Sequence, residues 1–127
     1  MENKVSISIK QHISHIAVEG DIFAVTTAEL KNAFEESWQR KVFKIILNLE
    51  NSKLINSSGI GVIVGALKTC RDSSSSGDLV ILNPPSYVKR TMRIMGLDKF
   101  VPTKENEQEA IDYLQSKKGA DEDTPFF

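Results

Sequence analysis

Hydrophobic and polar residues alternate along the first part of the chain, which is the pattern of a β-strand with one buried face. Val5, Ile7 and Ile9 are separated by polar residues. The run HIAVEGDIF, residues 15–23, follows after a few polar residues and predicts a second strand. Because so short a connection joins the two strands, we expect them to pair as an antiparallel hairpin.

Two later segments are apolar almost without interruption. Residues 43–50 read FKIILNLE, and residues 78–83 read DLVILN between a glycine and a proline. Short, β-branched apolar runs of this kind are typical of central strands covered on both faces, as parallel strands are. The two segments are therefore predicted to form the middle of a sheet, and Phe100 and Val101 are predicted to add a short edge strand.

Residues 26–38 are predicted to form a helix that covers this sheet. Thr26 and Glu29 have the spacing of a capping box at its start. Its apolar face consists of Leu30, Phe34, Ser37 and Trp38. A second amphipathic helix is predicted over residues 56–71. Its core stripe consists of Ile60, Ile63, Val64 and Leu67.

Two more helices are predicted in the second half of the chain. The first covers residues 87–95, with Gly96 as its C-terminal cap. Its buried stripe consists of Val88, Met92 and Met95. The second covers residues 105–117, with Ala110, Ile111 and Leu114 on one side. The alternation of strands and helices predicts an α/β fold, a small mixed β-sheet backed by about four helices.

The length of the chain, 127 residues, suits one ordinary domain. We expect that domain to comprise residues 1–117. Residues 118–127 contain acidic residues, glycine and proline but no hydrophobic periodicity. They are predicted to form a disordered acidic tail.

The charge balance excludes several classes of function. The 16 Lys and Arg against 17 Asp and Glu give a net charge of −1, so the chain has no basic footprint for nucleic acid or an anionic membrane. No run approaches the roughly 18 apolar residues of a transmembrane helix. The single cysteine, Cys70, cannot form an internal disulfide, which favours a reducing compartment. We therefore expect a cytoplasmic protein that contacts neither nucleic acid nor membrane.

Residues that could carry catalysis or bind a metal have no suitable neighbours in the sequence. Cys70 has no His and acid constellation around it and is expected to be a small buried side chain. His12 and His15 lack further ligands at zinc-site spacing and are expected on the surface or in a turn. The serines at 73–76 are expected to form a flexible turn. The sequence thus predicts no enzyme activity and no metal.

The glycines of the run GIGVIVG do not form a nucleotide-binding motif. Gly59, Gly61 and Gly65 lack G-x-G-x-x-G spacing, and no Gly-Lys-Ser/Thr follows. We therefore expect no nucleotide cofactor. Gly61 and Gly65 lie four residues apart, so a helix that carries them can approach a neighbouring element closely or leave a shallow surface for a partner.

The junction LINSSGIG, residues 54–61, is the most informative stretch. Asn56 is a good N-cap residue, which places Ser57 and Ser58 in the first turn of the second helix. A helical wheel gives a second stripe that we expect to be exposed and to form a contact surface. This stripe consists of Ser58, Val62, Gly65 and Thr69. An alternative is that the two serines only favour the start of a helix.

This junction resembles the motif of the anti-sigma factor antagonists, the STAS-domain family, in which Asp-Ser-Ser-Gly-Leu-Gly opens a helix after a strand. The motif here reads Asn56, Ser57, Ser58, Gly59, Ile60 and Gly61, so Asn stands where the family usually has Asp. The similarity extends over about residues 4–115. It includes the stretches VEGDIF, TTAELKNAF, KIILNLENSKLINSSGIGVI and LVILNPPSYVKRTMRIMGLDKF. Phe23 and Ala24 depart from the family's Gly-Glu-Leu-Asp segment, which has an Asp after its apolar residue.

The resemblance implies a protein-binding switch with no catalysis of its own. In the family, the protein binds an anti-sigma factor that is also a serine kinase; the kinase phosphorylates the second serine of the motif and a phosphatase removes the phosphate. That serine corresponds to Ser58 rather than Ser57, and ATP belongs to the kinase. The resemblance and the helical pattern together predict a partner-binding surface. It consists of Asn56, Ser57, Ser58, Gly59, Gly61, Val62 and Gly65.

Two alternatives remain. The first is a non-switching STAS subunit of another assembly, such as a lipid transport complex or a sensory scaffold, where the same surface would dock a constant partner. The second is a small enzyme. The sequence argues against it, because it shows no paired carboxylates, no Ser, His and Asp set, and no metal-ligand spacing.

Overall fold

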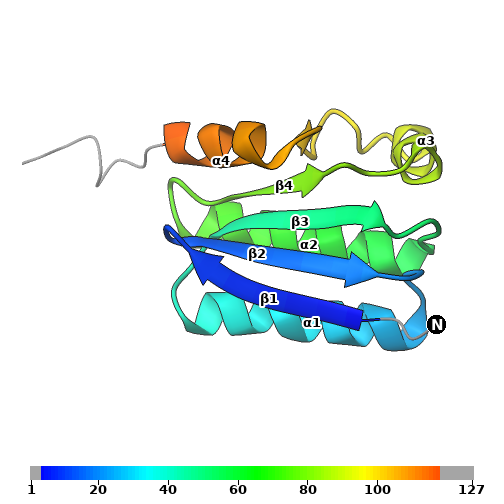
Figure 1. Ribbon diagram of the computed structural model, residues 1–127, viewed down its shortest axis with the longest axis horizontal. Coiled ribbons are helices and arrows are strands. Elements are labelled where there is room, and N and C mark those ends of the chain that lie inside the picture. The colour runs from blue at the N-terminus through cyan, green and yellow to red at the C-terminus, as the bar shows by residue number, and fades with distance from the viewer. Residues whose placement is uncertain (1–3, 118–127) are drawn as a thin grey trace, which may run out of the picture.

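In a computed structural model, the protein forms a five-stranded sheet with helices on both faces (Figure 1). The structure describes residues 4–117, so the predicted acidic tail lies outside the described residues. The strand order is β1-β2-β3-β4-β5; β1 is antiparallel to β2, and the other neighbouring pairs are parallel. The small mixed sheet with four helices confirms the predicted fold class.

The elements follow one another in the predicted order. The strands are β1 (Lys4–Lys10), β2 (Ile13–Glu19), β3 (Lys44–Asn51), β4 (Asp78–Leu82) and β5 (Thr103–Lys104). The helices are α1 (Ala24–Gln39), α2 (Ser57–Ser73), α3 (Ser86–Ile94) and α4 (Glu107–Ser116).

The central strands have two buried faces because helices cover both sides of the sheet. In β3, Ile45 and Leu47 belong to the large core shared with α1 and α2, whereas Ile46 belongs to a smaller core under α4. All five residues of β4 are buried. Figure 1 shows α1 and α2 side by side on one face, α4 on the other, and α3 beyond the C-terminal end of β4. The apolar runs therefore form covered central strands, as predicted.

The strand β2 ends earlier than its apolar pattern indicated. The chain turns after Glu19 because Gly20 adopts a left-handed conformation with φ 97°, which glycine tolerates without a steric penalty. Two residues later, Ile22 makes a single parallel bridge with Ile55. This bridge brings the start of α1 next to the start of α2, where the predicted contact surface lies.

The capping box predicted for the first helix is wrong. The helix begins at Ala24, its N-cap residue is Phe23, and no side chain caps it. Thr26 therefore lies inside the first turn, where it is 1% exposed, rather than at the cap. The helix starts early because the backbone bridge at Ile22 fixes where the chain leaves the sheet.

At the end of α3, the structure confirms the predicted role of Gly96 in ending the helix, but the predicted burial of Met95 is wrong. Gly96 has φ 74° and donates its N–H to Arg93 O, while Leu97 N–H bonds to Met92 O at 2.8 Å, which is a Schellman-type end. Met95 is the C-cap and is 47% exposed, because the helical stripe ends one residue before it. Leu97 packs against the core instead.

The predicted edge strand exists, but it lies three residues further along the chain. Thr103 and Lys104 pair with β4, whereas Phe100 is 63% exposed and Val101 is buried in the loop before β5. His15 also differs from its predicted surface or turn position. It lies within β2, half-buried, with Nδ1 3.6 Å from Glu107 Oε1, and burial lowers its pKa. His12 is in the turn between β1 and β2, as predicted.

Candidate functional site

The connection from β3 to α2 lies at the C-terminal edge of the parallel strands, beside the connection from β2 to α1. Ile22 N–H donates to Leu54 O at 2.8 Å, and Asn56 N–H donates to Ile22 O at 3.1 Å. The two connections are thus joined by backbone hydrogen bonds on both sides of the Ile22–Ile55 bridge. This is the edge at which α/β sheets present functional loops.

The side chain of Asp21 provides a further attachment. Its Oδ1 accepts a hydrogen bond from Leu54 N–H at 3.2 Å. Nearby, Gly20 N–H bonds to Asn51 O at 3.0 Å, and the buried Ser52 hydroxyl donates to Val18 O at 3.3 Å. The backbone that leads into the serines is therefore held on the sheet by both main-chain and side-chain contacts.

Asn56 caps the start of α2, as predicted. Its Oδ1 accepts a hydrogen bond from Gly59 N–H at 2.9 Å, and its own carbonyl accepts from Ile60 N–H at 3.1 Å. Ser57 and Ser58 are the first two residues of the helix, and both are exposed. The first turn carries no acidic residue, so the positive end of the helix dipole is not offset there by a carboxylate of its own.

Gly59 packs closely against the bridge between Ile22 and Ile55. It is buried, and a Cβ at this position would stand 2.7 Å from Ile22 Cγ2 and 2.9 Å from Ile55 Cγ1. Only glycine allows the first turn of α2 to lie this close to the bridge. Gly59 thus contributes to the internal packing of α2, and its place in the predicted partner-binding surface stays a prediction.

Gly61 and Gly65 have the opposite surroundings. Both are exposed, and a Cβ at either position would have no heavy atom within 4 Å. Internal packing thus does not require glycine at either position, and each glycine destabilises the helix by about 0.8–1.0 kcal/mol relative to alanine. Their effect is to leave the outer surface of α2 flat next to Ser58.

Val62 is not the exposed residue that the helical wheel indicated. It is half-buried and packs against the main core, and Thr69 is half-buried too. The outward surface of α2 is instead centred on Gly61, Gly65 and Lys68. The difference arises because α1 packs beside α2 and covers one flank of it.

Two exposed apolar side chains lie in the connections that lead into α1 and α2, and a third stands at the start of α3. Phe23 is 42% exposed and Leu54 38% exposed, and both belong to the hydrogen-bonded connections described above. Tyr87, 52% exposed, stands at the start of α3 next to Val88. Sequence analysis missed these three, because single apolar residues in loops carry no periodic signal.

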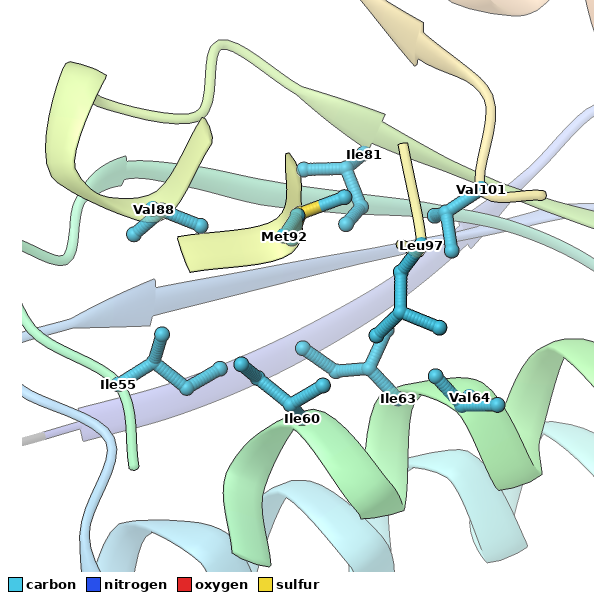
Figure 2. Close-up of a pocket in the computed structure, with 9 residues that line it drawn as sticks. All are labelled: Ile55, Ile60, Ile63, Val64, Ile81, Val88, Met92, Leu97 and Val101. Carbon is cyan, nitrogen blue, oxygen red and sulfur yellow. The ribbon is translucent and has the colours of Figure 1, made fainter. Parts of the chain in front are cut away.

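A small apolar void separates α2 from α3 and offers no ligand site (Figure 2). Its volume is about 10 Å³, near the lower limit for one water molecule, and its lining has no polar atoms to hold one. In Figure 2 the side chains of Ile60, Ile63, Met92 and Leu97 point into the space between the two helices. The contact positions α3, and with it Tyr87, relative to α2.

The remaining candidate residues show no catalytic or metal-binding arrangement. Cys70 is fully buried, and burial raises the pKa of its thiol to about 11, so it is a core side chain, as predicted. Across residues 4–117, no group of three His, Cys, Asp or Glu side chains is placed to hold a metal ion. Within the same range, no helix has the length and apolar character to cross a membrane.

Comparison with known proteins identifies the family. The model of the STAS domain matches residues 4–110. The anti-sigma F factor antagonist of Paenibacillus polymyxa is 30% identical over 101 residues, which cover 79% of this chain and 85% of the relative. The anti-sigma-B factor antagonist of Listeria monocytogenes is 32% identical over 109 residues, 83% of this chain and 93% of the relative. The chain belongs to the anti-sigma factor antagonist (STAS domain) family.

Solved structures show the same STAS fold. The Bacillus anti-sigma factor antagonist SpoIIAA in its unphosphorylated form has a TM-score of 0.68 at 22% identity and covers 90% of this chain and 98% of its own. Its phosphorylated form has a TM-score of 0.69 at 21% identity, and the match covers 87% of this chain and 99% of the SpoIIAA chain. The resemblance drawn from the motif at residues 56–61 is therefore confirmed at the level of the family and the fold.

Proposed function

We propose that this protein is a phosphorylation-controlled binding switch. In its unmodified form it binds a kinase-type anti-sigma factor, and phosphorylation of Ser58 releases that partner. The proposal is supported by the relatives, which are named antagonists of anti-sigma factors. One observation carries it. Ser58 is exposed in the first turn of a capped helix, and the outward surface of the helix next to it is formed by Gly61 and Gly65.

The surroundings of Ser58 favour a phosphate that leaves the fold intact. The first N–H groups of a helix lack intrahelical acceptors, and the helix dipole is positive at that end. No acidic side chain of the first turn would repel the phosphate. Because Ser58 is exposed, the added group would extend into solvent. We therefore expect the modified protein to remain folded.

The same phosphate would oppose binding of a partner. The flat surface at Gly61 and Gly65 allows another chain to approach the backbone of α2 closely. The exposed side chains of Phe23 and Leu54, in the two connections joined at the start of α2, supply apolar contact area. A surface closed over Ser58 would have to desolvate a charge of about −1.5 to −2. A penalty of about 3 kcal/mol weakens affinity by more than about 100-fold. This is sufficient to convert a bound partner into a free one.

The choice of Ser58 over Ser57 comes from the family motif, because the two serines are both exposed. SpoIIAA has been solved in phosphorylated and unphosphorylated forms with this fold, which supports modification as the means of control. In the proposed cycle the anti-sigma factor brings the ATP and acts as the kinase, and a serine phosphatase restores the unmodified form. We propose no cofactor for the chain itself, and we propose that it acts in the cytoplasm, together with these partners.

Titration calorimetry with the cognate anti-sigma factor tests the switch. Ser58→Asp should stay folded and bind at least about 100-fold more weakly than wild type, from the penalty estimated above. Ser58→Ala should bind like the unmodified protein and resist release by the kinase and ATP. Ser57→Ala is the matched control and should remain switchable. Equal affinities for wild type and Ser58→Asp, with no phosphate on the peptide in mass spectrometry, would instead favour the non-switching STAS subunit.

A second pair of variants tests the contact surface. Gly61→Glu places a large charged side chain at an open position, so it should leave folding unchanged and weaken binding by about tenfold or more. Lys68→Glu changes the charge on the same outward surface two turns away and should have a much smaller effect on affinity. If the two variants bind equally well, the surface next to Ser58 is not where the partner docks.

A further inference from the structure

A second concave surface lies at the opposite edge of the sheet from Ser58. Its volume is about 560 Å³, and it is formed where the β1–β2 turn, the connection from α1 to β3 and the connection from α2 to β4 meet. The residues that give it chemical character are Gln11, His12, Lys41, Lys44, Ser76 and Gln115. None of the described residues that line it is acidic. The concavity therefore presents ammonium, imidazole, amide and hydroxyl groups, which suit an anionic ligand.

Three residues of this lining have left-handed backbone conformations, which glycine adopts more easily than other residues. Gln11 has φ 56°, His12 φ 62° and Lys41 φ 62°. The left-handed region is unfavourable for residues with a Cβ, and such conformations cluster at functional sites. Each position thus keeps a polar or cationic side chain where the backbone alone would favour glycine. The local structure imposes these conformations, because Gln11 and His12 form the two-residue turn of the β1–β2 hairpin and Lys41 follows the end of α1.

The chain beyond α4 leaves the described structure beside this concavity. Lys44 Nζ donates a hydrogen bond to Lys117 O at 3.1 Å, and Gln115 is itself part of the lining. The acidic stretch Asp121, Glu122 and Asp123 begins four residues after Lys117. Four extended residues span about 13 Å. The acidic stretch is therefore tethered within reach of the cationic side chains.

We propose that this concavity is a binding site for an acidic peptide segment, and that Asp121–Asp123 of the same chain occupies it. Opposite charges and a short tether raise the local concentration of the acidic stretch at the site. Binding would neutralise the basic edge of the domain, so that an external anionic partner could bind there only by displacing the segment. This inference does not depend on the switch at Ser58.

A nitroxide spin label on Thr124→Cys tests the proposal by NMR. Thr124 directly follows the acidic stretch, and native Cys70 is fully buried, with a thiol pKa raised to about 11, so the label should attach at position 124. We expect the amide signals of Gln11, His12 and Lys41 to lose most of their intensity. The signals of Ser58 and Gly61, at the far edge, should keep theirs. Equal losses at both edges, or none, would overturn the proposal.

Two matched variants identify the cause of any signal loss. The variant with Asp121→Asn, Glu122→Gln and Asp123→Asn removes the acidic side of the attraction and should restore the signals. Lys41→Gln removes one of the two lysines of the lining and should restore them in part. Raising the NaCl concentration to about 0.5 M, where the Debye length is about 4 Å, should also restore the signals. Signal loss that survives all three changes would show that charge attraction does not cause it, and the proposal would fail.

The occupant could also be the acidic stretch of a second copy of the chain. Mixing isotope-labelled protein that has no spin label with unlabelled protein that carries one distinguishes the two cases. Binding within one chain predicts no signal loss in the mixture. A loss of amide signal at Gln11 and Lys41 that grows with protein concentration would overturn the proposal that the segment binds its own domain.

Discussion

Lys117 Nζ lies 2.8 Å from Asp78 Oδ2, and this ion pair joins the end of α4 to the start of β4. The Asp78 side chain is fully buried, and it also accepts hydrogen bonds from Tyr113 OH at 2.7 Å and Arg71 Nε at 3.0 Å. Burial by itself raises the pKa of Asp78, but the hydrogen bonds from Lys117 and Tyr113 outweigh it and hold that pKa below the usual value of an aspartate. A single carboxylate thus attaches two helices to the sheet.

Asp78→Asn should lower the free energy of unfolding by about 1–3 kcal/mol, because the amide cannot match the charge-assisted hydrogen bonds of the carboxylate. Urea denaturation at neutral pH measures the change. The control is Lys68→Gln, which removes an exposed Lys68–Asp72 pair of 3.4 Å and should change stability by no more than about 0.5 kcal/mol. Equal effects of the two variants would show that the buried pair contributes no more than a surface one.

The lowered pKa of Asp78 predicts a loss of stability in acid. Since the folded pKa lies below the unfolded one, the unfolded chain binds more protons in this range. The contribution is fully present above the ordinary aspartate pKa of about 3.9 and is lost as the pH falls from there through the folded pKa. Asp78→Asn should flatten this part of the curve in urea denaturation repeated at a series of acidic pH values. An unchanged acid slope in the variant would contradict the assignment.

Gly59→Ala and Gly61→Ala should change stability in opposite directions. The added methyl group at Gly59 meets Ile22 and Ile55 at under 3 Å, so it should cost about 1–3 kcal/mol and lower the Tm. At Gly61 the same methyl group has no heavy atom within 4 Å, and the higher helix propensity of alanine should stabilise the fold by about 0.8–1.0 kcal/mol. Calorimetric melting of the two variants provides the measurement. A stabilised Gly59→Ala would mean that α2 can shift away from Ile22 without cost.

Removal of residues 119–127 should leave folding unaffected. The segment has no apolar periodicity to bury, and exposed charge contacts contribute at most about 1 kcal/mol. The Tm should therefore change by no more than about a few degrees, as measured by circular dichroism. A larger fall would show that Phe126 or Phe127 packs against the domain.

The site itself was only partly predictable from the sequence. Asn56 and the exposed serines could be found because a cap and a helix start involve residues three or four apart. The reason for Gly59 could not be found, since its constraint comes from Ile22, which is distant in sequence. The outward direction of Val62 was predicted wrongly because the wheel does not show that α1 covers that flank of α2.

The sequence by itself determined the elements, their order and the core residues of the strands, because periodicity and capping depend on neighbours along the chain. Tertiary structure alone decided which residues meet across the fold. The Asp78–Lys117 pair, the contact of Gly59 with Ile22, and the bridge between Ile22 and Ile55 all join residues far apart in sequence. Their energies arise from burial and close packing, which exist only once the sheet and its helices have assembled.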